Sequence, residues 1–292
     1  MNGAGFIDHR GLDFNAVVAL TYDVEQSFCY EYASPIRDLR HRLVVVPRDE
    51  HGDQRRISRQ LSVTPDARAR SDRDAFGNDI VDFAVSHVEH SIRFSLNSRV
   101  VRDRRFGPHR VDPAQLADPA LRGIRRLIRL DAALRDAGEG IRSLYPRPAE
   151  CAEAIVRFVH REMIYTKAVT DIFTTASVAF SMRRGVCQDY AHVTIALARA
   201  CGLTARYVSG HLLGEGATHA WVEFLIPHPG GDVHVAAFDP TTGRATDWRY
   251  VVVAVGRDYE DVAPSSGVFT GAPTGRQGAQ QTVRIVAVTF AA

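Results

Sequence analysis

The feature that most constrains the fold is the strand-like pattern of the first third of the chain. Between residues 15 and 103, polar turn clusters at DEHGD and DAFGND separate short apolar runs, namely AVVALTYDVEQSF, HRLVVVP, RQLSVTP, DIVDFAVSHVE and SIRFSLNSRVV. Short strands divided by turn signals are typical of a sandwich of two sheets, because each strand buries one face against the opposite sheet. The sequence therefore predicts an N-terminal β-sandwich domain over residues 1–103.

Helical spacing replaces this pattern after residue 103. Residues 104–145 hold a helical stretch at 121–138, which predicts a helical connector. Pro148 begins a helix that places five residues on one apolar face, Cys151, Ile155, Phe158, Val159 and Met163. After an irregular stretch at 166–185, residues 187–201 predict a second helix, which begins at Cys187 and ends before Gly202.

Two strands near the end of this region form a predicted antiparallel hairpin. HAWVEFLI and DVHVAAFDP are joined by the turn-rich PHPGG. Counting outward from the turn places His219 opposite a position within about one residue of Asp239. The predicted architecture is α+β, with a papain-like core over residues 146–262 and a loop and C-terminal strand over residues 263–292.

Composition excludes several classes of protein. No apolar run approaches the roughly 18 residues of a membrane helix, and the N-terminus lacks the pattern of a secretory signal. From the N-terminal pattern we expect a cytoplasmic protein. The four cysteines form no CxxC pair, so we expect reduced thiols and no disulfide framework. The arginines between Arg99 and Arg129 are mixed with Asp103, Asp112 and Asp118, which is typical of a solvated face rather than a nucleic-acid site. Lys167 is the only lysine, which fits codon bias toward arginine.

Cys187 is the first candidate for chemistry. A thiol attacks an acyl group as thiolate, and a helix N-terminus and a neighbouring imidazolium both lower a thiol pKa. The N–H of Cys187 at the helix start is also placed to bind an oxyanion, although the sequence does not reveal a second donor. Gly185, two residues before, would leave room for a substrate backbone. Asp189 is interpreted as a first-turn acid favoured by the helix dipole.

His219 and Asp239 complete a predicted catalytic set. A thiolate needs a base whose ring is held by an acid on its far side, and the chain supplies the order Cys, His, Asp. Trp221, which alternates with His219 along the strand, would wall the site or lie in the core. Glu215, in the loop before the strand, is a candidate for contacting substrate.

Three segments around these residues, GVCQDYAH, SGHLLGEGATHAWVEF and FDPTTGR, closely resemble the motifs of bacterial transglutaminase-like proteins, which include candidate cysteine proteases. TYDVEQSFCYEYASPIRDLRHRLVVVP and DAFGND resemble the N-terminal β-domain of the same family. The resemblance implies a transglutaminase-like core with Cys187 as nucleophile, His219 as base and Asp239 as orienting acid. It also implies a small peptide or isopeptide substrate.

The reaction itself stays open among three possibilities. We expect hydrolysis of a peptide, isopeptide or side-chain amide bond through a thioacyl-enzyme. The alternatives are a transamidase that uses an amine acceptor and a non-catalytic binding module on the same fold. No cofactor is expected. A metal site at His192, His211 and His219 is disfavoured, because no HExxH motif is present and the triad explains the thiol better.

Overall fold

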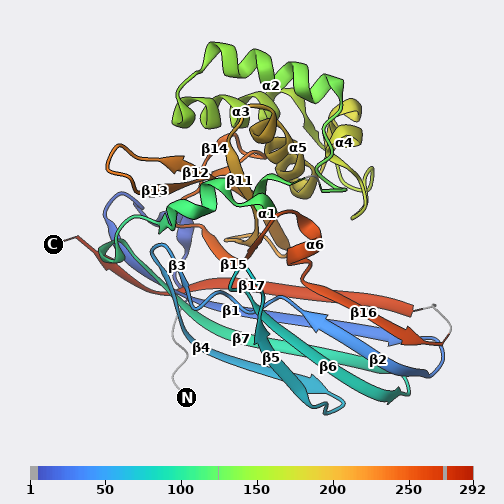
Figure 1. Ribbon diagram of the computed structural model, residues 1–292. Coiled ribbons are helices and arrows are strands. Elements are labelled where there is room, and N and C mark those ends of the chain that lie inside the picture. The colour runs from blue at the N-terminus through green and yellow to red at the C-terminus, as the bar shows by residue number, and fades with distance from the viewer. Residues whose placement is uncertain (1–5, 124, 272–274, 292) are drawn as a thin grey trace.

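The computed structural model describes residues 6–123, 125–271 and 275–291, which form two packed regions (Figure 1). One region is a sandwich of long strands, and the other is a twisted sheet covered by helices. Both ends of the chain lie at the sandwich, so the helical region is inserted between its strands. Within the described residues no helix has the length and apolar composition needed to cross a bilayer.

The sandwich consists of a five-stranded and a four-stranded antiparallel sheet. In spatial order the first contains β17 (Gly275–Phe290), β1 (Val17–Tyr32), β7 (Ser91–Asp103), β4 (Gln54–Thr64) and β3 (Glu50–His51). The second contains β16 (Ser265–Thr270), β2 (Ile36–Leu43), β6 (Asp79–Val88) and β5 (Ala69–Arg73). The predicted N-terminal β-sandwich therefore has strands from both ends of the chain.

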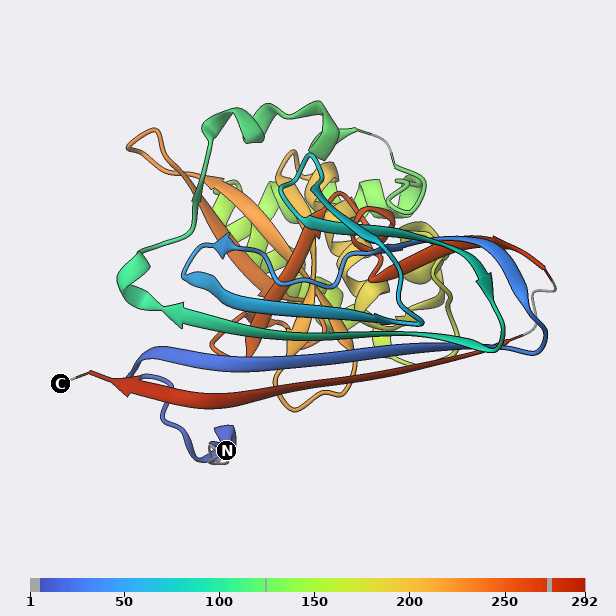
Figure 2. The same ribbon diagram turned by 90° about the horizontal axis from the view of Figure 1, so that it is seen from below.

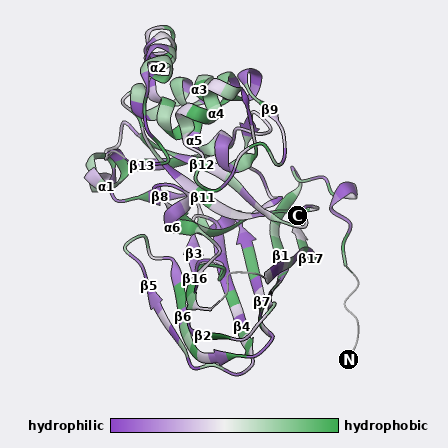
Figure 3. Ribbon diagram, turned by 90° about the vertical axis from the view of Figure 1, so that its right-hand side faces the viewer, coloured by the Kyte–Doolittle hydropathy of each residue, from purple (hydrophilic) through white to green (hydrophobic). Residues whose placement is uncertain are grey.

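Alternating burial along the strands explains why these two sheets pack. In β7 every second residue from Ile92 to Val100 is buried, and hydrophobic and hydrophilic residues alternate along the sandwich strands in Figure 3. Phe83 of one sheet and Phe94 of the other meet with their ring centroids 4.7 Å apart. This period of two buries one face of each strand and leaves the other in water.

The C-terminal segment, predicted as a loop and a strand over residues 263–292, contains two strands in the described residues. Residues 265–270 form β16 beside β2, and β17 begins at Gly275 and pairs with β1 along its whole length. Figure 2 shows β1, β7 and β17 running side by side as the longest strands. Backbone pairing needs no particular side chain, so pairing with β1 and β2 outweighs the Gly and Ser content that predicted a loop. The intervening residues 272–274 lie outside the described residues.

The inserted region has an antiparallel sheet at its centre. In spatial order its strands are β14 (Arg244–Ala245), β13 (Val233–Asp239), β12 (Thr218–Pro227), β11 (Thr204–Leu212) and β15 (Tyr250–Gly256), with β8 (Arg110–Val111) beside β13. A separate parallel pair is formed by β9 (Ile164–Tyr165) and β10 (Arg184–Gly185). The predicted hairpin is present as β12 and β13.

Helices α2–α5 cover one side of this sheet (Figure 1). The helices are α1 (Pro119–Arg122), α2 (Ala132–Leu144), α3 (Pro148–Glu162), α4 (Ala176–Met182), α5 (Cys187–Ala200) and α6 (Tyr259–Val262). α5 is buried along nearly its whole length, and it shares one core with α2, α3 and the inner face of β12. A rigid α5 fixes the position of its first residue, Cys187.

Two local predictions in this region were wrong. The helical stretch at 121–138 is not one helix, because the Asp131 side chain accepts a hydrogen bond from the Leu134 N–H and starts α2 afresh. The irregular stretch at 166–185 contains α4, whose N-cap Thr175 accepts a hydrogen bond from the Val178 N–H. Seven residues of α4 are too few to show a helical period in the sequence.

Candidate active site

Cys187 is the first residue of α5 and is half-buried. The turn before it is held by Asp189, whose Oδ2 accepts hydrogen bonds from the Val186 N–H at 2.8 Å and from the Thr170 hydroxyl at 2.7 Å. The first N–H groups of a helix have no partners inside the helix, so the Cys187 N–H lies free of the helix ladder. Asp189 thus fixes the geometry of the turn that presents the thiol.

Gly185 supports this turn and does not line the pocket beside Cys187. A Cβ atom at Gly185 would stand 2.5 Å from Asp189 Oδ2 and 2.6 Å from Asp189 Cβ. The space beside Gly185, predicted to receive a substrate backbone, is therefore filled by the Asp189 side chain. Gly185 is required for the cap that positions Cys187.

His219 and Asp239 form a buried pair at one end of β12. His219 Nε2 and Asp239 Oδ2 are 2.8 Å apart, and the side chains are 4% and 0% exposed. The Tyr250 hydroxyl donates to the same carboxylate oxygen at 2.8 Å, while the Thr241 N–H and hydroxyl donate to Oδ1 at 2.8 and 2.6 Å. Asp239 is thus held from both sides, which fixes the orientation of the His219 ring.

The pKa values of the pair move in opposite directions. Burial by itself lowers the pKa of His219, but the hydrogen bonds with Asp239, Cys187 and Glu215 outweigh burial and raise it well above its usual value. Burial by itself raises the pKa of Asp239, whereas its hydrogen bond and charge interaction with His219 lower it overall. The arrangement favours an imidazolium–carboxylate pair at neutral pH.

The strand register brings the pair together differently from the predicted register. Pairing between β12 and β13 ends at Val222 and Phe238, so Asp239 lies one step beyond, level with Trp221 rather than His219. His219 was predicted to lie opposite a position within about one residue of Asp239. In this register the position opposite His219 is two residues from Asp239, so the prediction was wrong by one residue. Asp239 reaches back to His219 because it ends β13, where the chain turns and Thr241 bonds its carboxylate.

Cys187 and His219 line one pocket of about 300 Å³. Its other lining residues come from the β9 segment, α5, β11, β12 and the stretch around α6, namely Tyr165, Lys167, Val186, Gln188, Tyr207, Ser209, Thr218, Ala220, Tyr259 and Pro264. Cys187 also contributes to the raised pKa values of Tyr165 and Tyr207, for which burial is the larger cause. The pocket brings a thiol, a histidine and phenol groups together.

Trp221 lies in the core, whereas Glu215 lies beside His219. Trp221 is 1% exposed and is absent from the Cys187 pocket. It packs where a Cβ atom at Gly210 would meet its Cη2 atom at 2.4 Å, so it is a core residue. Glu215 is half-exposed, and its Oε2 lies 3.4 Å from His219 Nδ1, the nitrogen that does not face Asp239. Of these two, Glu215 is the one next to the reacting groups.

Several residues of the site were missed by sequence reasoning. Thr241 had a signal, because an Asp followed two residues later by Thr at a strand end is a common turn pattern. Tyr250 had none, since only the fold brings β15 to the end of β13. Lys167, noted only as the single lysine of the chain, also lines the pocket.

The other histidines considered for a metal do not gather with His219. His192 lies in the core, where its Nε2 accepts a hydrogen bond from the Tyr259 N–H at 3.2 Å. His211 is 1% exposed and is buried beside Gln281 of β17. Within the described residues neither belongs to a group of three metal-ligating side chains.

Comparison with known proteins agrees with this architecture. Residues 135–257 match the family model described as the transglutaminase-like superfamily, and residues 22–101 match the bacterial transglutaminase-like N-terminal region. An uncharacterized protein of Mycobacterium tuberculosis is 31% identical over 274 residues, which cover 85% of this chain and 87% of the relative. A protein of Mycobacterium leprae is 35% identical over 134 residues, which cover 42% of this chain and 46% of the relative.

Among solved structures, that of a candidate cysteine protease from Cytophaga hutchinsonii matches with a TM-score of 0.74 at 21% identity. The match covers 94% of this chain and 93% of that one, which shows the shared fold across both regions. The predicted fold class, a transglutaminase-like core with an N-terminal β-domain, is thereby confirmed. The chain belongs to the transglutaminase-like superfamily and carries the N-terminal region of its bacterial members.

Proposed function

We propose that this protein is a thiol-dependent acyl-transfer enzyme that hydrolyses a peptide, isopeptide or side-chain amide bond. Cys187 is the nucleophile, His219 the acid and base, and Asp239 the residue that orients the imidazole. One observation carries the proposal: His219 is buried between the Asp239 carboxylate at 2.8 Å and a pocket that it shares with the thiol at the start of α5.

The reaction proceeds in two steps. The Cys187 thiolate attacks the carbonyl carbon and forms a C–S bond, and the C–N bond breaks as the His219 imidazolium gives its proton to the leaving amine. The neutral imidazole then takes a proton from water, which attacks the thioester. The C–S bond breaks, the acid product leaves, and the released thiolate lies beside the imidazolium, which keeps the proton taken from water.

The electrostatics of the site support this sequence of steps. The raised pKa of His219 favours a proton on the ring at neutral pH, where that proton is needed for the leaving amine. Asp239 keeps its charge beside the ring and also accepts hydrogen bonds from Tyr250 and Thr241. The N–H of Cys187, at the start of α5, is the proposed first donor to the oxyanion.

A peptide library treated with the enzyme in H₂¹⁸O, with and without a primary amine, tests the proposal. We expect product acids that carry one ¹⁸O atom and no incorporated amine, read by mass spectrometry. Amine incorporation with little free acid would identify a transamidase instead. Tight peptide binding without turnover would identify a binding module.

Two cysteine variants separate catalysis from general thiol effects. Cys187→Ala should lower turnover by about 1,000-fold or more, because the step that forms the acyl-enzyme is lost. Cys29→Ala is the matched control, since Cys29 is half-buried in β1 of the sandwich and should leave turnover unchanged. Equal turnover of Cys187→Ala and wild type would refute the assignment of the nucleophile.

The expected partner is a peptide or protein that offers an amide bond, and the proposed compartment is the cytoplasm. All four cysteines are free thiols, which supports a reducing environment. Cell fractionation with a periplasmic marker enzyme tests the compartment. Recovery of the protein with the periplasmic marker would contradict it.

A further inference from the structure

A cluster of two histidines and a glutamate lies between the sandwich and the inserted sheet, apart from the Cys187 pocket. His51 ends β3, His109 precedes β8, and Glu223 lies in the middle of β12. His51 Nε2 is 2.6 Å from Glu223 Oε1, and His109 Nδ1 is 3.9 Å from the same oxygen. One ligating atom from each residue lies within 4.8 Å of the other two.

The cluster is held firmly by its surroundings. The side chains of His51, His109 and Glu223 are 5%, 19% and 2% exposed. Arg206 Nε binds the other carboxylate oxygen of Glu223 at 2.7 Å, which leaves Oε1 directed at the imidazoles. Gly52 has a φ of +56°, and a Cβ atom there would meet His109 Cβ at 2.8 Å, so this glycine permits the close packing of His109.

A purely structural ion pair explains only part of this arrangement. His51 and Arg206 together satisfy both oxygens of Glu223 and would tie β3 to β12 without any ligand. His109 is not needed for that purpose, since neither of its ring nitrogens has a hydrogen-bond partner in the described part of the chain. The His109 side chain is 19% exposed, and its ring lies beside the Glu223 carboxylate without bonding to it, a placement that a ligand shared by the three side chains would explain.

We propose that His51 Nε2, His109 Nδ1 and Glu223 Oε1 bind a divalent transition-metal ion such as Zn²⁺. Two imidazoles and one carboxylate are donors that Zn²⁺ and its first-row neighbours accept, whereas Ca²⁺ and Mg²⁺ prefer oxygen alone. Three protein ligands leave one tetrahedral position for water or another ligand. Arg206 acts as the outer partner that orients the ligating carboxylate.

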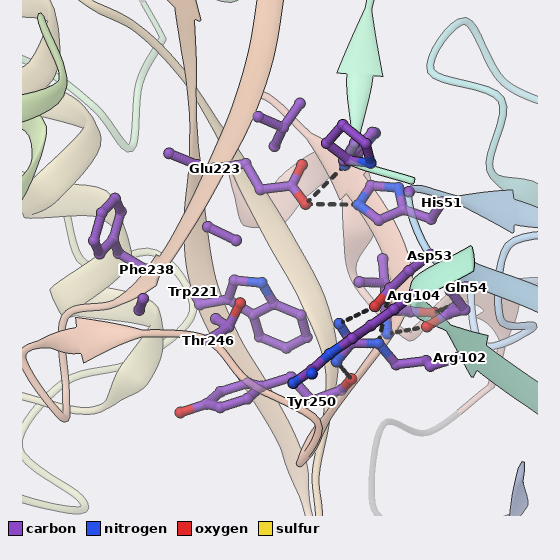
Figure 4. A pocket seen from close by; sticks show the side chains of 18 of the residues that line it. His51, Asp53, Gln54, Arg102, Arg104, Trp221, Glu223, Phe238, Thr246 and Tyr250 are labelled. Atoms are coloured by element: carbon purple, nitrogen blue, oxygen red, sulfur yellow. Dashed lines mark hydrogen bonds and ion pairs between the residues drawn. The ribbon is translucent and has the colours of Figure 1, made fainter. Parts of the chain in front are cut away.

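His51, His109 and Glu223 all line a cavity of about 540 Å³, shown in Figure 4. Arg102 and Arg104 line the cavity with Trp221 and Tyr250. The nearby arginines oppose a cation, so we expect weaker binding than in a structural zinc site and an anion, such as hydroxide or a carboxylate, as fourth ligand. The site is independent of the proposed acyl-transfer function.

Titration of the chelator-treated full-length protein with Zn²⁺ by calorimetry, and with Co²⁺ by visible absorption, tests the proposal. The Cys187→Ala background removes a half-buried thiol that could bind the same ions. We expect one ion per chain and Co²⁺ bands typical of nitrogen and oxygen ligation. A protein that binds neither ion at millimolar concentration would overturn the proposal.

His109→Ala is the decisive variant, because the bonds that join Glu223 to His51 and Arg206 remain and the fold should be kept. Loss of an outer-shell partner costs about 10- to 100-fold in metal affinity, so loss of a ligand should cost at least as much. His228→Ala is the matched control. His228 stacks on His234 at 4.5 Å, with no carboxylate of the described residues completing a ligand set there.

Metal-free thermal unfolding of both variants shows whether the fold is intact. Unchanged affinity in His109→Ala would overturn the site, as would an equal loss of affinity in His228→Ala. Glu223→Gln provides a second check and should lower the metal affinity as His109→Ala does. It also leaves Arg206 buried without its charged partner, so its metal affinity is interpreted together with its thermal unfolding curve.

Discussion

Two histidine–carboxylate pairs border the same strand and behave in opposite ways. At one end of β12, His219 lies 2.8 Å from Asp239, and in the middle of the strand Glu223 lies 2.6 Å from His51. All four side chains are at most 5% exposed. Distance and burial alone therefore give no reason to expect a different charge state.

The difference comes from the second partner of each carboxylate. Asp239 is also bound by neutral donors, Tyr250 and Thr241, so its charge acts mainly on His219 and raises the pKa of that ring. Glu223 is also bound by the Arg206 guanidinium, and burial then dominates and lowers the pKa of His51. In this chain the histidine whose carboxylate is shared with an arginine has a lowered pKa, and the one whose carboxylate is not has a raised pKa.

The largest expected effect is on thiol labelling, because only the His219 pair faces a cysteine. With an imidazolium beside it, Cys187 should react with iodoacetamide at nearly the same rate from about pH 5 to pH 7. In His219→Ala the rate should rise about tenfold per pH unit, as for an ordinary thiol, or roughly 100-fold over the range. Peptide mapping by mass spectrometry measures each cysteine separately.

The control for this experiment is His87→Ala, which removes an exposed histidine that also pairs with a glutamate, Glu89. Its profile at Cys187 should match wild type, while the buried Cys151 and Cys201 label slowly in every variant. A tenfold rise per unit in the wild-type protein would mean that Cys187 and His219 form no resting ion pair.

A second effect is on stability, where the sign follows from the raised pKa of His219. A group whose pKa is raised above 6.5 by folding stabilises fully below pH 6.5, and this contribution is lost as pH rises toward the folded-state value. The gap in unfolding free energy between wild type and His219→Gln should therefore shrink above pH 6.5, by at most about 1.4 kcal/mol per unit. Urea unfolding at pH 6 and pH 9 measures it, and a gap that widens with pH would contradict the assignment.

The sequence predicted the features that depend on short spacings along the chain, but not those that depend on contacts between distant segments. Cys187 could be placed at a helix start because Gly202 marks the helix end, and His219 and Asp239 could be placed on a hairpin from the PHPGG turn. Each of these inferences depends on spacing within some 20 residues. The N-terminal sandwich was visible for the same reason, since period-two burial is a local signal.

What the sequence did not reveal depends on contacts between distant segments. His51, His109 and Glu223 meet only because β3 and the segment before β8 pack against β12, and no spacing rule connects them. The pairing of β17 with β1 joins opposite ends of the chain, and the sequence predicted a C-terminal strand without indicating its partner. Gly185 was predicted to give room for substrate, and Trp221 was left between the site wall and the core, because their neighbours Asp189 and Gly210 could not be known before the fold.

A smaller effect should follow from removing one neutral donor to Asp239. Tyr250→Phe keeps the ring and leaves both Thr241 bonds, so the carboxylate stays charged but loses one of its supports. A hydrogen bond to a charged group contributes about 1.5 kcal/mol or more, so kcat should fall about tenfold. Thr241→Val, which removes a hydroxyl bond to the other oxygen, should give a similar fall. A loss as large as that of His219→Ala would mean that Tyr250 takes part in proton transfer.

The smallest expected effect concerns Lys167, the lysine that lines the Cys187 pocket. Arg206 is bound to Glu223, whereas the exposed Lys167 in the Cys187 pocket has no carboxylate within ion-pair distance among the described residues. Its ammonium is therefore free to bind a carboxylate on the substrate. Exposed ion pairs contribute up to about 1 kcal/mol, so Lys167→Met should raise KM about two- to fivefold for acidic peptides and leave kcat unchanged.

Lys167→Arg keeps the charge and should retain most of the affinity, while neutral analogues of the same peptides should not distinguish the three proteins. If Lys167→Met instead lowers kcat for acidic and neutral peptides alike, Lys167 acts on the reacting groups and not on the substrate carboxylate. In that case Lys167, like Arg206, would set the charge state of a histidine–carboxylate pair, and its loss should also alter the pH profile of Cys187 labelling.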